Sequence, residues 1–434
     1  MPTCPSNAVC RHPAHVLIKP AGPDCNLRCK YCFYLEKHAL FVEEKSCRMT
    51  DDVLEHYIRS YIASQPTQEI EFAWQGGEPT LMGLPFYRRA VALQKHYGAG
   101  RTINNSLQTN GTLLTDEWCA FLAEEKFLVG LSIDGPEEIH NRYRVFKDGR
   151  GAFAQVDRAA KLMRKHGVEY NALTCVTRES AYEGKQIYRF LRDYGFEFMQ
   201  FIPIVEREPD ERSRELGLAL ASPPPTDAPS EPSPMMPFAV EALQYGQFLV
   251  DIFEEWVRRD VGKVFVNHFD CALGAWYGGN PSLCIYAKVC GSSLAIEHDG
   301  SIYACDHFVY PEFNRGNIMR EDMAGLLSSN RQQAFGMSKW LDLPSCCRHC
   351  DYLHACHGGC LKHRSATSPE GEPGLNYLCP GYKLFFKHVD PYMKQMVELL
   401  REGRPAADIV NFLPRRELHS KAQAKRKRKK GRRK

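Results

Sequence analysis

The sequence predicts an α/β protein in which at least six strand–helix units precede a Cys-rich domain. Strand-type and helix-type patterns alternate through residues 15–204, and such alternation indicates a parallel sheet. Residues with reactive side chains follow the ends of predicted strands, where parallel α/β folds place their sites. Beyond residue 270 the regular elements shorten, and ten cysteines stand between Cys271 and Cys379.

The predicted strands are short apolar or alternating runs that end at glycine or polar loops. They span residues 15–19, 69–74, 103–109, 128–133, 170–176 and 198–204. The predicted helices repeat apolar residues at helical spacing, and Thr50 or Asp51 can cap the first of them. They span residues 50–64, 84–96, 116–125, 153–166 and 182–194. Six units are fewer than the eight of a closed barrel.

We divide the chain by composition. A short extension (1–14) precedes the strand–helix region (15–215), and a linker or insertion follows at 216–237, whose core holds seven prolines. Residues 238–270 begin with a long amphipathic helix over 238–259, and the Cys-rich domain covers 271–385. A closing helix is predicted over 382–400, so that 386–414 is a helical C-terminal segment, followed by a tail at 415–434.

Composition favours a soluble, cytoplasmic protein. Hydrophobic residues make up 44% and charged residues 25% of the chain, no run of 18 apolar residues occurs, and no secretory signal precedes Pro13. The 18 cysteines stand at tight spacings, which in a cytosolic chain indicate metal binding more than disulfides. The tail holds twelve Lys or Arg and one Glu. Such a segment is expected to be disordered, either merely solvated or in salt-dependent contact with nucleic acid.

The most informative stretch follows the first predicted strand. Cys25, Cys29 and Cys32 stand in C-x3-C-x2-C spacing, with Phe33 and Tyr34 directly after them. Iron–sulfur cubes usually take four Cys ligands, so three ligands leave one iron open. An open metal position is typical of a catalytic site, because a substrate or cofactor can bind there. Half of a zinc site is the alternative interpretation.

At these residues the chain resembles the radical S-adenosylmethionine (SAM) enzymes. The resemblance implies an open, partial (β/α)6 barrel in which SAM chelates the open iron and is cleaved to a 5′-deoxyadenosyl radical. Gly76, Gly77 and Glu78, in G-G-E-P, match the family motif that binds the amino group of SAM. Two glycines let the backbone approach a ligand, and Glu78 adds an acceptor for an ammonium group. Without the Cys loop, G-G-E-P would be only a turn.

Further SAM contacts are expected at other strand ends. The resemblance places Ser132 and Asp134, in L-S-I-D-G, against the ribose or carboxylate of SAM. Arg144 is suited to pair that carboxylate through its bidentate fork. Thr109 and Asn110 are weaker candidates of the same kind. The alternative is structural, because Asp-Gly-Pro is also favourable turn chemistry.

The Cys-rich domain holds eight thiols at regular spacing, enough for two four-Cys sites. Zinc would accept four thiolates equally well, so spacing alone does not choose the metal. The pattern resembles the SPASM domain of radical SAM enzymes that modify peptides and proteins, and that resemblance implies two auxiliary [4Fe–4S] clusters, three in all. The implied ligands interleave as Cys284, Cys290, Cys305 and Cys360 for one cluster and Cys347, Cys350, Cys356 and Cys379 for the other. Cys346 leaves an ambiguity of one residue.

The narrower resemblance is to the anaerobic sulfatase-maturating branch. It rests on N-P-S-L-C-I-Y-A-K-V-C-G, E-H-D-G-S-I-Y-A-C-D-H-F-V and F-A-W-Q-G-G-E-P-T-L, and with the Cys loop it covers most of residues 16–382. It implies an oxidoreductase that converts a Cys or Ser of a sulfatase polypeptide to Cα-formylglycine, with an electron donor such as flavodoxin or ferredoxin. Asp306 becomes the base that takes the substrate's S–H or O–H proton. The resemblance also implies that Tyr34, Gln75 and His307 shape the substrate pocket and that Tyr34 lies beside the cofactor.

Two alternatives stay open. Another radical SAM/SPASM reaction, such as a peptide crosslink or an epimerisation, fits the same cofactors, although Asp306 in C-D-H-F-V argues against it. A non-enzymatic, zinc-stapled regulatory protein with a nucleic-acid-binding tail is the second. The incomplete set of three cysteines followed by G-G-E-P argues against that protein.

Overall fold

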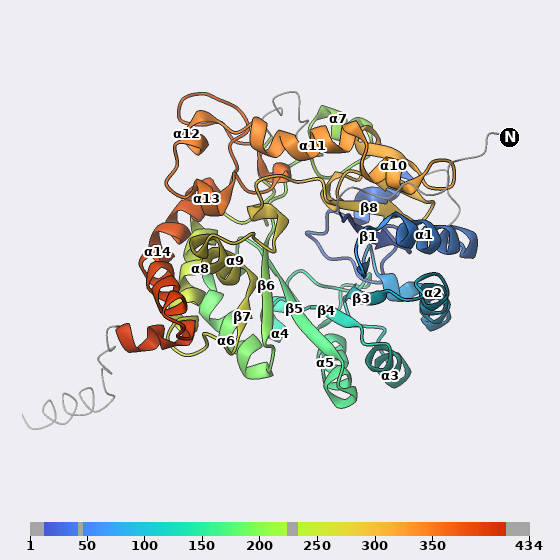
Figure 1. The fold of residues 1–434 in the computed structure, drawn as a ribbon, viewed down its shortest axis with the longest axis horizontal. Coiled ribbons are helices and arrows are strands. Elements are labelled where there is room, and N and C mark those ends of the chain that lie inside the picture. Colours follow the sequence, from blue (N-terminus) through green and yellow to red (C-terminus); the bar gives the residue numbers. More distant parts are fainter. Residues whose placement is uncertain (1–12, 42–46, 224–232, 414–434) are drawn as a thin grey trace, which may run out of the picture.

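The computed structural model describes residues 13–41, 47–223 and 233–413 (Figure 1). The basic tail, most of the N-terminal extension and the middle of the proline-rich segment lie outside these residues. One ten-stranded sheet runs through the described part of the chain in the order β10-β9-β8-β1-β2-β3-β4-β5-β6-β7. The order of β1 to β6 in space therefore follows their order in the sequence, as expected for consecutive β/α units.

The first seven strands are parallel to their neighbours. They are β1 (His15–Lys19), β2 (Glu69–Trp74), β3 (Thr102–Thr109), β4 (Leu128–Ser132), β5 (Glu169–Val176), β6 (Phe198–Pro203) and β7 (Phe265–Val266). The predicted α/β fold is confirmed, and every strand expected between residues 15 and 204 is present within two residues of its expected bounds.

Helices return the chain between these strands, and Figure 1 shows α1, α2, α3, α5 and α6 one after another along the outside of the sheet. They are α1 (Asp51–Ser64), α2 (Leu84–Tyr97), α3 (Asp116–Glu124), α5 (Phe153–His166) and α6 (Gly184–Tyr194), with short α4 (Glu137–His140) and α7 (Glu211–Glu215) in loops. Thr50 caps α1 by accepting a hydrogen bond from the backbone of Val53. The apolar face of α1, including Leu54 and Tyr57, is fully buried. The capping residue therefore fixes where this helix begins, and its apolar face fixes how it packs.

The Cys-rich part of the chain continues the same sheet. β8 (Ser293–Glu297) pairs in parallel with β1, in a register that places Glu297 opposite Lys19. β9 (Ser301–Tyr303) and β10 (Asn314–Asn317) follow antiparallel. β1 therefore lies between β2 and β8. This pairing brings residues nearly 300 positions apart to the same end of the sheet.

The remaining helices surround this extension. α8 (Ala242–Trp256) packs against α14 (Cys379–Arg401), which runs through residue 385, so the expected domain border there falls inside one helix. The others are α9 (Asn267–Tyr277), α10 (Met323–Leu327), α11 (Asn330–Leu341), α12 (Ser345–Arg348) and α13 (Leu353–Cys356). No helix among the described residues is long and apolar enough to cross a membrane.

Candidate functional site

The three cysteines of the first motif share one cavity. Cys25, Cys29 and Cys32 lie in the loop that leaves β1, and all three line a cavity of about 1130 Å³. Backbone bonds fix the loop against the segment after α4, because Arg28 N–H donates to the carbonyl of Val145 at 2.7 Å. The thiols are partly buried and open to the cavity. This arrangement fits a cluster that binds three thiolates and leaves one position accessible.

The electrostatics of these thiols call for a cation. Burial, followed by the charges of Glu78 and Cys32, raises the pKa of Cys25 to about 12. Burial likewise raises the pKa of Cys29. Free thiolates are therefore unfavourable here, whereas bound iron would stabilise them, because metal binding displaces the thiol protons. Within the described residues no three His, Cys, Asp or Glu side chains form a group suited to a single metal ion, and a cube of four irons takes more widely spaced ligands.

The glycines of G-G-E-P serve a close approach between two loops. Gly77 N–H donates to the carbonyl of Gly22 at 2.8 Å, and Glu78 N–H donates to the carbonyl of Asp24 at 2.7 Å. A Cβ atom added to Gly77 would lie 2.0 Å from the Asp24 carbonyl oxygen. Any side chain at this position would push the loop after β2 away from the Cys loop.

Both oxygens of the Glu78 carboxylate accept hydrogen bonds from the chain. Its side chain is fully buried. One carboxylate oxygen accepts hydrogen bonds from the Thr80 N–H, the Thr80 hydroxyl and the Thr109 hydroxyl, and the other accepts from Asn110 N–H. Burial raises its pKa, while these hydrogen bonds oppose that shift. These contacts connect the ends of β2 and β3, and contact of Glu78 with the amino group of SAM stays a prediction.

Asn110 connects the Glu78 carboxylate with the Cys loop through hydrogen bonds. Its side-chain amide donates to Oδ1 of Asn26 at 2.9 Å and lies 3.8 Å from the sulfur of Cys25. Asn26 in turn donates to the Thr112 hydroxyl at 2.8 Å. The two weaker candidates from the sequence, Thr109 and Asn110, therefore connect Glu78 with the first cysteine.

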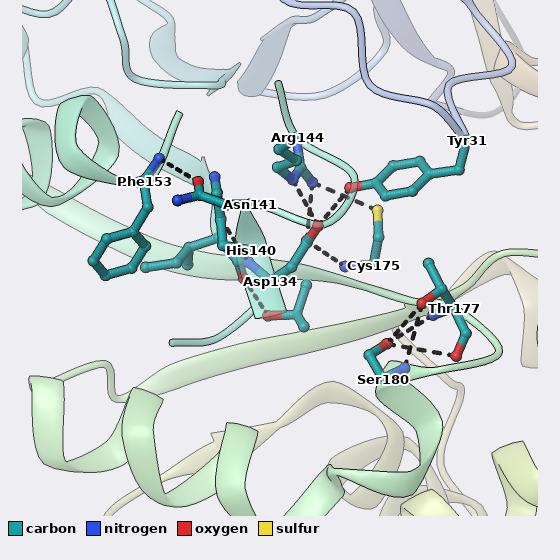
Figure 2. Close-up of polar contacts among 11 residues, drawn as sticks. Tyr31, Asp134, His140, Asn141, Arg144, Phe153, Cys175, Thr177 and Ser180 are labelled. Carbon is teal, nitrogen blue, oxygen red and sulfur yellow. Dashed lines mark hydrogen bonds and ion pairs between the residues drawn. The ribbon is translucent and has the colours of Figure 1, made fainter. Parts of the chain in front are cut away.

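Asp134 and Arg144 form a buried ion pair (Figure 2). The guanidinium donates from Nε and Nη2 to the two carboxylate oxygens at 2.9 and 3.1 Å, and Tyr31 donates its hydroxyl to Asp134 at 2.6 Å. Although burial opposes ionisation of Asp134, Arg144 and His140 lower its pKa. The guanidinium of Arg144, which we expect to face the carboxylate of SAM, therefore binds Asp134. Ser132 is buried at the end of β4. Their direct contact with SAM stays a prediction.

A second buried ion pair joins the two parts of the sheet. Lys19, the last residue of β1, donates from Nζ to Oδ1 of Asp306, which directly follows Cys305. The same Nζ lies 4.4 Å from the centre of the Tyr34 ring, and the Tyr34 hydroxyl donates to Glu297. Burial opposes ionisation of Asp306, but Lys19 and His307 lower its pKa. Asp306 is therefore a carboxylate at neutral pH.

Sequence reasoning missed Lys19 and Glu297. Both end apolar strands, H-V-L-I-K and S-L-A-I-E, and both are buried to within 1% of full burial. For Lys19 the available signal was a charged residue at the carboxyl end of a predicted parallel strand, because that end of the sheet carries the sites. Glu297 offered no such signal, because its strand was not predicted.

Two other predicted pocket residues carry unpaired polar atoms. Among the described residues, neither Nδ1 of His307 nor Oε1 of Gln75 has a hydrogen-bond partner, although both atoms are buried. Burial, followed by the charge of Lys362, lowers the pKa of His307 to about 3, so its ring is neutral. The ring packs against Phe33 with centroids 5.1 Å apart. Buried unpaired groups are costly, which favours a bound ligand that completes them.

The auxiliary cysteines gather as two separate sets. Burial raises the pKa of Cys284, Cys290 and Cys305, and in each case Cys360 raises it further. The second set lines a narrow cavity of about 30 Å³, and it includes the additional thiol of Cys346. Its members are Cys346, Cys347, Cys350, Cys356 and Cys379. The structure thus brings the interleaved sets together, and their ligation of clusters stays a prediction.

Comparisons with known proteins agree with this geometry. The sequence matches the Radical SAM superfamily over residues 20–191 and the iron–sulfur cluster-binding domain SPASM over residues 284–351. It is 45% identical to a serine-type anaerobic sulfatase-maturating enzyme of Bacteroides thetaiotaomicron, covering 92% of this chain and 95% of that protein. Identity is 35% to a cysteine-type anaerobic sulfatase-maturating enzyme of Clostridium perfringens, covering 87% and 97%. A solved structure, native anSMEcpe with bound AdoMet and Cp18Cys peptide, superposes with a TM-score of 0.76 at 33% identity, covering 89% and 99%.

Proposed function

Since the chain belongs to the anaerobic sulfatase-maturating enzymes of the radical SAM superfamily, we propose that it oxidises a Ser or Cys side chain of a sulfatase to Cα-formylglycine. The observation that carries the proposal is the buried, ionised Asp306, which contacts Lys19 at the end of β1, the strand that leads into the Cys loop. The base must reach the oxygen or sulfur of the substrate while the radical reaches the adjacent Cβ, so both must face the same bond. Here β1 contacts Asp306 through Lys19 and leads directly into the Cys loop.

The cofactors have named holders. Cys25, Cys29 and Cys32 would hold the SAM-binding [4Fe–4S] cluster, which with SAM supplies the radical that removes a hydrogen atom from the substrate's Cβ. The two interleaved cysteine sets would hold auxiliary clusters suited to one-electron transfer. Gly76, Gly77 and Glu78 would border SAM on one side, and Ser132, Asp134 and Arg144 on the other.

The chain's own residues account for the proton and for the substrate. Asp306 takes the O–H or S–H proton, so that the oxygen or sulfur can form a double bond to Cβ, and the auxiliary clusters would accept the second electron. Ser then gives the aldehyde directly, whereas the thioaldehyde from Cys is hydrolysed by water with release of sulfide. A carboxylate is required for this step, and the contact with Lys19 keeps it ionised. The unpaired atoms of Gln75 and His307 would form hydrogen bonds with the peptide. The Tyr34 hydroxyl donates to Glu297, which holds the Tyr34 ring in place.

The partners follow from the reaction. The substrate is a sulfatase polypeptide, and the greater similarity to the serine-type relative supports activity on Ser as well as Cys. We also propose an electron carrier such as flavodoxin or ferredoxin and a cytoplasmic location, because the cofactors need reducing conditions. Contact between the 415–434 tail and nucleic acid stays a prediction from its charge.

The test is anaerobic turnover of a peptide. The reconstituted protein is incubated with SAM, a reductant and matched peptides containing S-x-P-x-R or C-x-P-x-R, and the products are read by mass spectrometry. Aldehyde at the Ser or Cys position, trapped by a hydrazine, is expected. A modified peptide without aldehyde would favour another SPASM reaction, and a colourless preparation without iron would contradict the enzyme altogether.

A further inference from the structure

Lys19 is a buried cation in the site to which the resemblance assigned no role. It is the last residue of β1 and is 1% exposed. Its ammonium contacts Asp306, 287 residues further along the chain. An ammonium group is strongly disfavoured in a protein interior unless it is paired. Its position is therefore tied to Asp306.

The surroundings of Lys19 hold it on one side of that carboxylate. The β1–β8 register sets its backbone opposite Glu297, whose side chain is engaged by the Tyr34 hydroxyl. The Tyr34 ring lies under the ammonium at 4.4 Å, a distance at which the ring face attracts a cation. On the opposite side, the backbone of Lys19 lies against Gly76 of the loop after β2. Rotation of the side chain is thus restricted by three elements.

Asp306 is engaged through one oxygen only. Lys19 binds Oδ1, and within the described part of the chain no hydrogen bond reaches Oδ2. The residue retains a small exposed fraction of 9%, so one oxygen is fixed and the other stays free for a ligand. A bidentate arginine, such as Arg144 on Asp134, would have occupied both oxygens.

We propose that Lys19 is a positioning residue for proton removal, which holds Oδ1 of Asp306 so that Oδ2 faces the substrate hydroxyl or thiol. The inference rests on the proposed function, because it assumes that Asp306 is the base. In the step itself the substrate's O–H or S–H bond breaks and its proton bonds to Oδ2. Lys19 takes no part in this transfer; its contact with Oδ1 fixes the orientation of the carboxylate.

The experiment compares five variants of the full-length, reconstituted protein: Lys19→Met, Lys19→Arg, Asp306→Asn, the double variant Lys19→Met/Asp306→Asn, and Arg189→Met. The last is the matched control, because Arg189 pairs with buried Glu255 at the α6–α8 contact, away from the site. Iron per chain, 5′-deoxyadenosine and formylglycine are measured, together with kcat and KM for the peptide. Only iron-containing protein is compared, so a poorly assembled chain does not count as a loss of activity.

Lys19→Met should retain SAM cleavage and the peptide KM while kcat for formylglycine falls roughly 10- to 100-fold, the effect of a misplaced catalytic group. Lys19→Arg keeps the positive charge but moves it, so its kcat should lie between the values of Lys19→Met and of the unchanged protein. In the Asp306→Asn background, Lys19→Met should cause little further loss, because it acts through Asp306. If Lys19→Met yields no iron-containing protein, Lys19→Arg decides, and a lowered ratio of formylglycine to 5′-deoxyadenosine supports the proposal.

Three outcomes overturn it. Normal kcat in Lys19→Met shows that Asp306 needs no partner, and normal kcat in Lys19→Arg, where that variant decides, shows that turnover does not depend on how Oδ1 is held. Multiplying losses in the double variant show that Lys19 acts independently, and equal loss in Arg189→Met shows general destabilisation. Failure of the proposed function looks different, since the unchanged protein would then make no formylglycine, or Asp306→Asn would make it at the normal rate.

Discussion

Replacing Glu78 with Gln tests whether this buried carboxylate organises the SAM side of the site. Its two oxygens accept four hydrogen bonds, three of them on Oε1 at 2.6–3.0 Å and one from Asn110 N–H on Oε2 at 2.8 Å. Gln has only one accepting atom. Its amide is best placed with oxygen at the Oε1 position, so that the NH₂ group meets the Asn110 N–H, which loses its acceptor.

The cost follows from that mismatch. A buried donor left without a partner costs about 1–3 kcal/mol, and the remaining bonds weaken because the acceptor has lost its charge. If the cost falls on the ordered loop to which SAM binds, the Kd for SAM should rise about 5- to 150-fold. Asn110 would carry the disturbance to Asn26 and Cys25 through its side-chain amide.

Equilibrium binding of SAM to the reconstituted protein, with iron per chain measured in parallel, is the assay. Glu117→Gln is the matched control, because the Glu117 side chain is 74% exposed and, among the described residues, forms a surface ion pair with Arg88. We expect that variant to bind SAM normally. Unchanged SAM affinity and unchanged thermal stability in Glu78→Gln would refute the organising role.

Four further predictions concern the cofactors, the base and the tail. Changing Cys25, Cys29 and Cys32 together to Ala should lower iron from about twelve to about eight atoms per chain, by colorimetric assay, and an unchanged count would exclude them as ligands. Asp306→Asn should retain SAM cleavage and lower formylglycine roughly 10²- to 10⁴-fold by mass spectrometry, and near-normal yield would exclude it as the base. Gly77→Ala should abolish measurable SAM binding, because its Cβ would meet the Asp24 carbonyl, whereas Gly274→Ala, with open space around it, should bind normally. Truncation after Pro414 should leave turnover of a short peptide unchanged in the same mass-spectrometric assay, and a large loss would place the tail at the site.

Local patterns predicted the regular part of the fold. β1, β2 and α5 have the expected bounds, because alternation and helical spacing act over a few residues. β8 to β10 were not expected, since three to five residues with little alternation do not define a strand. Pairing across the sheet stabilises them, and the partner of β8 lies nearly 280 residues earlier. α14 also begins before its expected start, as Pro380 fits the first turn of a helix.

The candidate residues were found by type, but their partners were not. Arg144 and Glu78 are predicted because a guanidinium suits the carboxylate of SAM and a carboxylate suits its amino group. The same chemistry suits neighbouring protein groups, and both side chains are engaged by the chain itself, Arg144 by Asp134 and Glu78 by Thr80, Thr109 and Asn110. Sequence spacing carries no information on which of these partners is within reach. Gln75 and His307 behave oppositely, with buried atoms that have no partner among the described residues.

The placement of Asp306, the proposed base, depends on a contact between the two halves of the chain. Asp306 belongs to the Cys-rich part, whereas Lys19 and the Cys loop belong to the first strand–helix unit. The β1–β8 register, with Val16 opposite Leu294 and Ile18 opposite Ile296, buries apolar side chains on both strands and so fixes the two halves against each other. A slip of one residue would turn Lys19 to the other face of the sheet, away from Asp306. The apolar pairs of β1 and β8 therefore set the position of the Asp306 carboxylate relative to Lys19.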